Sequence, residues 1–203
     1  MSASTPVQYD QRHFRFKNDS GTESSTDWVA AEDTNITSAH IALDTNVRLR
    51  IVMSEVSVSG TLGRTTGAMQ LYYSLDGFAT AGVIVDGASS YVRSTASPNE
   101  TDGATLTGRQ LTQYGSNSFV SAGFDEADGA GTSVSPVADQ DYEFEPCIQF
   151  RSAEITPGVD VVSLRVQQPV SAEIDTYTVT PTYSALAASG PPVGSLPLMG
   201  AGR

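Results

Sequence analysis

Residues 175–183 constrain the fold more than any other part of the chain, because their side chains alternate strictly in character. Threonines occupy the even positions, and the odd positions carry Tyr177, Val179, Pro181 and Tyr183. A period of two places alternate side chains on opposite faces of a β-strand. Pro181 has no N–H to donate, so the segment is predicted to be an edge strand or to end there. Residues 161–167 alternate in the same way, and the short connection predicts an antiparallel hairpin between the two segments.

Three further segments show the period of a strand. In residues 12–17, Phe14 and Phe16 share one face, opposite His13, Arg15 and Lys17. In residues 47–58, the apolar face is Val47, Leu49, Ile51 and Met53, with Arg48 and Arg50 opposite. That pattern predicts a long strand with one buried face. In residues 142–151, Tyr142, Phe144, Ile148 and Phe150 share a face, and Pro146 predicts a bulge or an edge position.

Turn signals separate these strands. Asp76-Gly77 predicts a hairpin between strands at 69–74 and 83–85, and residues 86–140 are rich in small and polar residues typical of long loops. No window has an apolar stripe of helical period and length. The sequence therefore predicts an all-β, antiparallel β-sandwich. We expect one domain over residues 9–183, with an N-terminal arm (1–8) and an extended C-terminal arm (184–203).

The charge of the chain disfavours two classes of partner. Its net charge is −12 and its pI is about 4.3. Nucleic-acid affinity depends on Lys and Arg neutralising phosphates, and anionic membranes attract the same residues. We therefore expect neither nucleic acid nor membrane as a partner. The first residues form no basic or long apolar run, so we also expect no secretion signal and synthesis in a cytoplasm.

The C-terminal arm differs in composition from the rest of the chain. It carries no charge before Arg203 and consists largely of Ala, Gly, Pro, Ser, Leu and Met. Such a segment should be disordered in a free monomer unless something holds it. We expect a neighbouring subunit to do so, in a homo-oligomer or with another protein, through the apolar side chains Val193, Leu196, Leu198 and Met199.

A cluster of carboxylates lies between residues 125 and 145, with no Lys or Arg between 110 and 150. Its members are Asp125, Glu126, Asp128, Asp139, Asp141, Glu143 and Glu145. Clustered oxygen ligands can bind calcium, but the spacing does not match the helix-loop-helix calcium motif. The alternation at 139–145 favours a solvated acidic strand face, and calcium binding stays the alternative.

No residue pattern predicts catalysis or a cofactor. His13 and His40 are the only histidines, and neither belongs to a metal pair or a nucleophile motif. Cys147, the only cysteine, is expected in the core. Trp28 is expected to be a core residue rather than a ligand platform. Four tyrosines could line a binding surface, but a place at the core boundary is favoured: Tyr72, Tyr73, Tyr91 and Tyr114.

Several segments together resemble a domain of virion proteins from tailed bacteriophages. They are His13–Gly21, Trp28–Thr34, Val47–Arg50, Leu71–Ser74, Asp102–Thr105, Leu164–Val166 and Tyr177–Pro181, so the resemblance covers most of residues 9–183. Its motifs are structural, and it carries over no active-site residue.

The resemblance implies an immunoglobulin-like or jelly-roll sandwich that acts as a virion component rather than an enzyme. Acidic charge suits the exterior of a particle, and arms around a compact body suit a subunit bound into a lattice. We therefore expect a capsid decoration (cement) protein that contacts the major capsid protein. The alternative is a tail or fibre component that contacts tail subunits and binds host-surface glycans.

Overall fold

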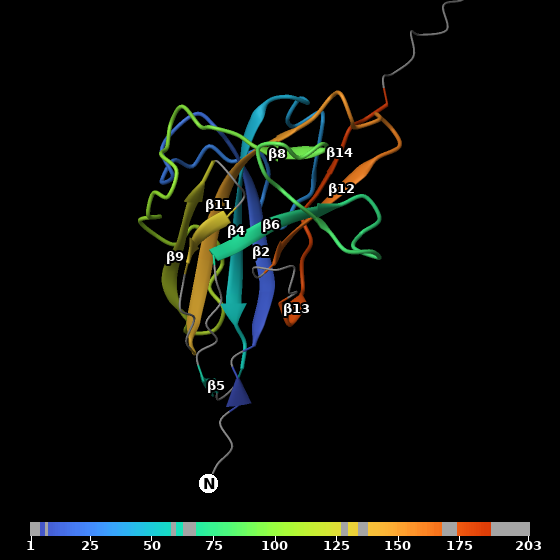
Figure 1. Cartoon of the computed structure of the whole chain (residues 1–203). Coiled ribbons are helices and arrows are strands. Elements are labelled where there is room, and N and C mark those ends of the chain that lie inside the picture. The colour runs from blue at the N-terminus through green and yellow to red at the C-terminus, as the bar shows by residue number, and fades with distance from the viewer. Residues whose placement is uncertain are drawn as a thin grey trace, which may run out of the picture.

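The computed structural model describes residues 5–6, 8–57, 60–62, 68–126, 130–133, 138–167 and 174–187. These residues form strands and loops, with no helix among them and hence none that could span a membrane. The strands make two curled, mixed sheets, an arrangement consistent with a β-sandwich (Figure 1). The all-β prediction is confirmed. The prediction of purely antiparallel sheets is wrong, because the first sheet contains two parallel pairs and the second sheet contains one.

The first sheet is built on three long strands. Its order is β13 (Thr176–Tyr177), β2 (Tyr9–Asn18), β4 (Asn46–Glu55), β11 (Gln140–Phe150) and β8 (Val92–Ser94), with β9 (Ser118–Asp125) also beside β11. The β13–β2 and β11–β9 pairs are parallel, and the remaining pairs are antiparallel. Because β4 lies between β2 and β11, both of its edges are hydrogen-bonded.

The second sheet has shorter strands. Its order is β10 (Ala130–Ser133), β6 (Ala68–Ser74), β12 (Val161–Gln167), β14 (Thr182–Ser184) and β3 (Ile36–Thr37), with β7 (Val83–Ile84) also beside β6. The β6–β7 hairpin confirms the turn predicted at Asp76-Gly77, where Gly77 has a φ of +69°. A separate parallel pair joins β1 (Thr5–Pro6) to β5 (Gly60–Leu62).

The apolar core joins side chains from both sheets. In the first sheet, Phe14 and Phe144 flank Ile51 in register on neighbouring strands, and all three are buried. Phe150 stacks on Tyr183 of the second sheet, with ring centroids 3.9 Å apart. Each such buried side chain contributes about 1.5–3 kcal/mol relative to exposure.

The period of β2 changes at one bulge. Gln11 pairs with Met53 and His13 with Val52, so Arg12 is an extra residue. A bulge shifts the parity of the side chains. Phe14 therefore points into the same core as Tyr9, although they lie at positions of opposite parity.

The segment 175–183 is not one strand, as its alternation predicted, but crosses from one sheet to the other. Asp10 on β2 accepts hydrogen bonds from the backbone N–H and hydroxyl of Thr178, at 2.8 and 2.6 Å, which holds β13 against the first sheet. After Pro181 the chain joins β12 as β14, so the predicted antiparallel pairing with residues 161–167 holds for residues 182–184 only.

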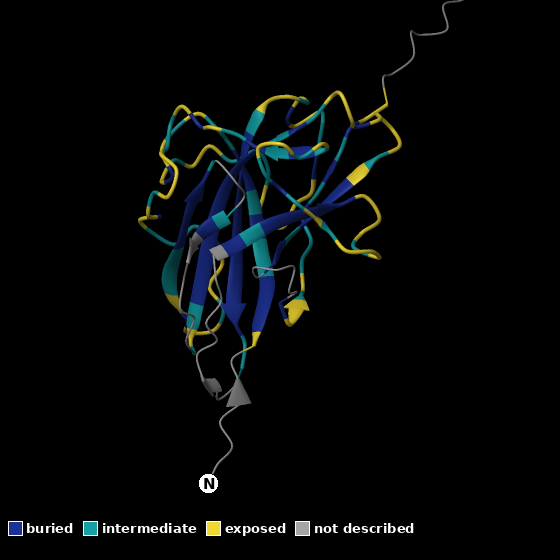
Figure 2. Cartoon of the chain, viewed as in Figure 1, coloured by how far each residue is buried: buried dark blue, intermediate teal, exposed yellow. Residues whose placement is uncertain are grey.

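The long strands β4 and β11 are buried on both faces (Figure 2). The prediction of one buried face for residues 47–58 is therefore wrong, since Arg48 and Arg50 have no exposed surface. The register of β11 against β9 shifts between Glu143 and Glu145, whereas Pro146, where a bulge was predicted, pairs in register with Asp125. Pro146 is not at an edge, because β11 has neighbours on both sides.

The expected arms are described only in part. Ser184 ends β14 and Ala185 belongs to the core, so these first residues of the expected C-terminal arm pack on the body. The four predicted contact residues lie outside the described residues: Val193, Leu196, Leu198 and Met199. The division into one domain and two arms stays a prediction.

Candidate functional site

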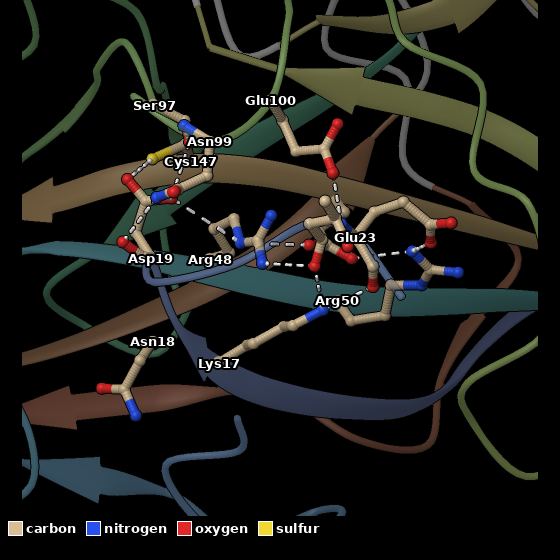
Figure 3. A network of polar contacts seen from close by, with 12 residues as sticks. Lys17, Asn18, Asp19, Glu23, Arg48, Arg50, Ser97, Asn99, Glu100 and Cys147 are labelled. Atoms are coloured by element: carbon tan, nitrogen blue, oxygen red, sulfur yellow. Dashed lines mark hydrogen bonds and ion pairs between the residues drawn. The ribbon is translucent and has the colours of Figure 1, made fainter. Parts of the chain in front are cut away.

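The outer face of the first sheet carries a network of buried charges (Figure 3). We call it the buried charge cluster. Its members come from β2, the loop that follows β2, β4 and β11: Lys17, Asp19, Glu23, Arg48, Arg50, Glu143 and Glu145. Buried charges are tolerated only where they are paired and hydrogen-bonded.

Arg50 is the centre of this cluster. Its Nε lies 2.6 Å from Glu143 Oε2 and its Nη1 lies 2.7 Å from Glu145 Oε2. Its Nη2 donates to the carbonyl oxygen of Gly108 at 2.6 Å. Burial lowers the pKa of Arg50, but the Glu145 and Glu143 carboxylates outweigh burial and hold this pKa above its ordinary value.

The strand register places like charges side by side. Lys17 pairs with Arg48 across β2 and β4, and Arg15 pairs with Arg50. Like charges directly opposite each other destabilise a sheet, so nearby carboxylates are needed. Lys17 Nζ donates to the carbonyl oxygens of Thr22 and Glu23. Burial lowers the pKa of Lys17 to about 8, against the attraction of Glu145.

The carboxylates of the cluster also hold the loops that cover the sheet. Glu143 accepts hydrogen bonds from the backbone N–H groups of Gln110 and Leu111. Glu23 accepts from the backbone N–H of Thr107 at 3.0 Å. Asp19 accepts from Ser97 Oγ at 2.6 Å. The cluster therefore fixes loops that are far apart in sequence to the sheet, and its role is to stabilise the fold.

A similar pair lies at the start of β11. Asp141 is fully buried, forms an ion pair with Arg109, and accepts from the backbone N–H of Tyr114 at 3.1 Å. The prediction of a solvated acidic face at 139–145 is therefore wrong for Asp141, Glu143 and Glu145, although Asp139 is exposed. Arginines and N–H groups already occupy these three carboxylates, so they give the calcium alternative no support. Asp128 of the predicted cluster lies outside the described residues.

Potential metal ligands come together elsewhere in the described part of the chain. Nδ1 of His13 lies 2.7 Å from Asp33 Oδ2 and 3.3 Å from Glu32 Oε1, and all three ligand atoms are within 4.8 Å of one another. The Asp33 carboxylate also accepts from the backbone N–H of Phe14, and Glu32 accepts from that of Thr112. The contacts of the imidazole with the two carboxylates join β2 to the next loop, which is a structural explanation of the arrangement.

Several other residues that were considered as candidate site residues have structural positions. Tyr73 belongs to the apolar core and Tyr91 packs against it, as expected, while Tyr72 is buried and Tyr114 is half-buried. Cys147 is buried, as expected, and burial raises the pKa of its thiol. His40 is exposed in a turn, where its Nδ1 lies 3.1 Å from the backbone N of Thr37.

Trp28 departs from its prediction as a core residue. It is half-buried and lines an open hollow of about 410 Å³ between two loops. Ser24 and Thr26 come from the same loop as Trp28, and residues 107–110 form the opposite wall. Sequence reasoning missed this hollow because its two walls are about eighty residues apart; the signal was the one tryptophan of the chain among hydroxyl residues.

Comparison with known proteins assigns no family to this chain. No family model, curated protein or solved structure matches it.

Proposed function

We propose that the protein is a structural component of a tailed-bacteriophage virion, and specifically a capsid decoration protein on the outside of the particle. The observation that carries the proposal is the place of the motif residues behind the resemblance. Lys17, Arg48 and Arg50 belong to the buried charge cluster, and Leu71, Leu164 and Val166 belong to the apolar core. Residues of this kind build the scaffold, so the resemblance supports a common fold, and the virion role rests on analogy with that fold.

The surface near the start of the C-terminal arm supports an assembly role. Val159, Val161 and Leu186 are exposed apolar side chains. Their segments are adjacent, because Gly158 N–H donates to the carbonyl oxygen of Ala185 at 2.7 Å and Val161 pairs with Ser184. Apolar residues gathered on a surface are typical of protein–protein contact. A partner subunit would cover them together with Val193, Leu196, Leu198 and Met199.

On this proposal the fold is an immunoglobulin-like or jelly-roll sandwich, and the protein is a homo-oligomer that contacts the major capsid protein. It has no catalytic role and needs no cofactor, and its acidic surface faces outward. Charge of one sign on the exterior also keeps particles apart in solution.

The copy number in purified virions tests the proposal. Quantitative mass spectrometry of particles from the phage that encodes this chain should find it in amounts comparable to the major capsid protein. Particles that lack it should rupture at a lower temperature than complete ones. Absence from particles, or unchanged rupture without the protein, would contradict a decoration role.

The second candidate is a tail or fibre component, which would be present in few copies. The hollow beside Trp28 favours it, because exposed aromatic surface among hydroxyl groups is a feature of sites that bind host glycans. Copy number separates the two candidates.

A further inference from the structure

The hollow beside Trp28 presents two kinds of surface to a ligand. Trp28 supplies aromatic surface, and Ser24, Thr26 and Thr107 supply hydroxyl groups. Its volume of about 410 Å³ lies within the range of small-molecule sites, roughly 300–1,000 Å³. A pyranose ring matches this combination, since its C–H groups pack on an aromatic face while its hydroxyl groups exchange hydrogen bonds at the rim.

Trp28 is held in place by β2. Trp28 forms a backbone bridge with Lys17 on β2, and the next residue, Val29, donates its N–H to Phe16 O at 2.9 Å. The Arg15 guanidinium lies 4.5 Å from the centroid of the Trp28 ring, and Lys17 Nζ lies 5.3 Å from it. Arg15 does not line the hollow. A ring held in this way loses little conformational entropy when a ligand packs on it.

The opposite wall is fixed by the buried charge cluster. Arg50 donates to Gly108 O, and Glu143 accepts from the backbone N–H of Gln110. The Gln110 side chain donates through Nε2 to Glu23 O at 2.5 Å, while its buried Oε1 has no hydrogen-bond partner. Because Oε1 has almost no accessible surface, Gln110 shapes this wall through its backbone and its Nε2 contact, not through a bond from Oε1 to a ligand.

The charge of the hollow selects among sugars. Arg109 is the one charged side chain among the described residues that line it. Its Nη1 pairs with Asp141 and its Nη2 donates to Asn117 O at 2.6 Å. Because Asp141 already balances the charge of Arg109, the hollow offers no unpaired cation to the carboxylate of an acidic sugar.

We propose that this hollow is a carbohydrate-binding site for a neutral pyranose within a polysaccharide. The proposal does not depend on the decoration role, because a head protein and a tail protein could each carry such a site. It is tested by binding, whereas the decoration role is tested by copy number.

The fluorescence of Trp28 gives a direct assay, because it is the only tryptophan. The purified chain is titrated with neutral trisaccharides of glucose, galactose, mannose and N-acetylglucosamine, and with the trisaccharide of galacturonic acid. At least one neutral trisaccharide should change the emission saturably, with a Kd in the millimolar range or below. No saturable change with any neutral trisaccharide, or binding of galacturonate alone, would overturn the proposal.

Gly108→Leu tests the location. A Cβ at Gly108 meets no atom within 4 Å, and this glycine does not have a positive φ, so the variant should fold. The added side chain should weaken binding by at least about tenfold. The matched control is Ala39→Leu, at an exposed loop residue that does not line the hollow, which should bind normally. Equal affinity in both variants would overturn the location.

Trp28→Ala tests the aromatic face, with saturation-transfer NMR as the readout because the variant has no tryptophan. The saturation transferred to the neutral trisaccharide bound by the parent chain should disappear while the cooperative urea transition remains. Undiminished transfer would contradict stacking on Trp28.

Discussion

The two faces of the β2–β4–β11 sheet are both buried along β4 and β11 but are held by different forces. The inner face packs Phe14, Leu49 and Phe144 against the second sheet, so its stability grows with apolar area removed from water. The outer face buries Arg50 and Glu143 beneath loops, where stability depends on pairing. Burial alone therefore does not tell how a position responds to substitution.

The largest expected effect is from Arg50→Met. This change leaves the Glu143 and Glu145 carboxylates buried without their partner, and breaking a buried pair costs about 3–5 kcal/mol. Urea unfolding should show this loss of free energy. Arg151→Met is the control, because its pair with Asp44 is partly exposed and such pairs contribute about 0–1 kcal/mol. Equal losses in the two variants would contradict the contrast between buried and exposed pairs.

On the inner face, the loss of stability caused by a substitution should follow the side-chain volume that it removes. Leu49→Ala should lower the free energy of unfolding by about 2–5 kcal/mol, because it leaves a cavity between the sheets. Leu49→Met keeps the volume and should cost less than about 1.5 kcal/mol. Both values come from urea unfolding. If Met were as destabilising as Ala, the inner face would not depend chiefly on filled volume.

The titration of Lys17 tests the burial of charge on the outer face. Lys17 is the only lysine of the chain, so ¹³Cε-lysine labelling gives one side-chain resonance. Its titration midpoint should be about 8 rather than the ordinary 10.5.

The same shift makes stability depend on pH. Between pH 8 and 10.5 the unfolded chain binds more protons at Lys17 than the folded chain does. The contribution of Lys17 to the free energy of unfolding should therefore rise with pH in this window. Lys17→Met should lack that rise. A midpoint near 10.5, or the same pH dependence in both chains, would show that burial does not perturb this amine.

The smallest effect concerns Cys147, which the outer face buries beside Phe124 and Leu106. Burial raises the pKa of its thiol, and the thiolate is the reactive form. A thiol reagent at pH 8 should modify the folded chain only as fast as it unfolds, and the chain in urea at once. Rapid modification without unfolding would show that the covering loops open locally.

The sequence predicts the inner face better than the outer one. Alternation identified Leu49, Ile51 and Phe144 as core residues, because any strand with one buried face shows that period. The same alternation predicted that the side chains of Arg50 and Glu143 are exposed to solvent. They pair across 93 residues of sequence, and the cover comes from loops without periodicity. One signal in the sequence could have indicated this pairing. Arg48 and Arg50 share one face of a long strand, and Glu143 and Glu145 share one face of another.

The hollow beside Trp28 could not be predicted from strand periodicity either, because loops form it. Its walls are loops positioned by the buried charge cluster, and a local pattern does not show which loops meet. The crossing between β13 and β14 was also missed, because side-chain bonds from Asp10, rather than strand period, decide where residues 175–178 lie.

A double-mutant cycle of Arg50→Met and Glu143→Gln tests most directly whether pairing holds the outer face. Glutamine keeps an oxygen that can accept from Gln110 and Leu111, so the cycle isolates the ion pair itself. Urea unfolding of the four chains should give a coupling free energy within the range of about 0.5–3 kcal/mol seen for residues in contact, near its upper end. Effects that add to within about 0.3–0.5 kcal/mol would contradict the account.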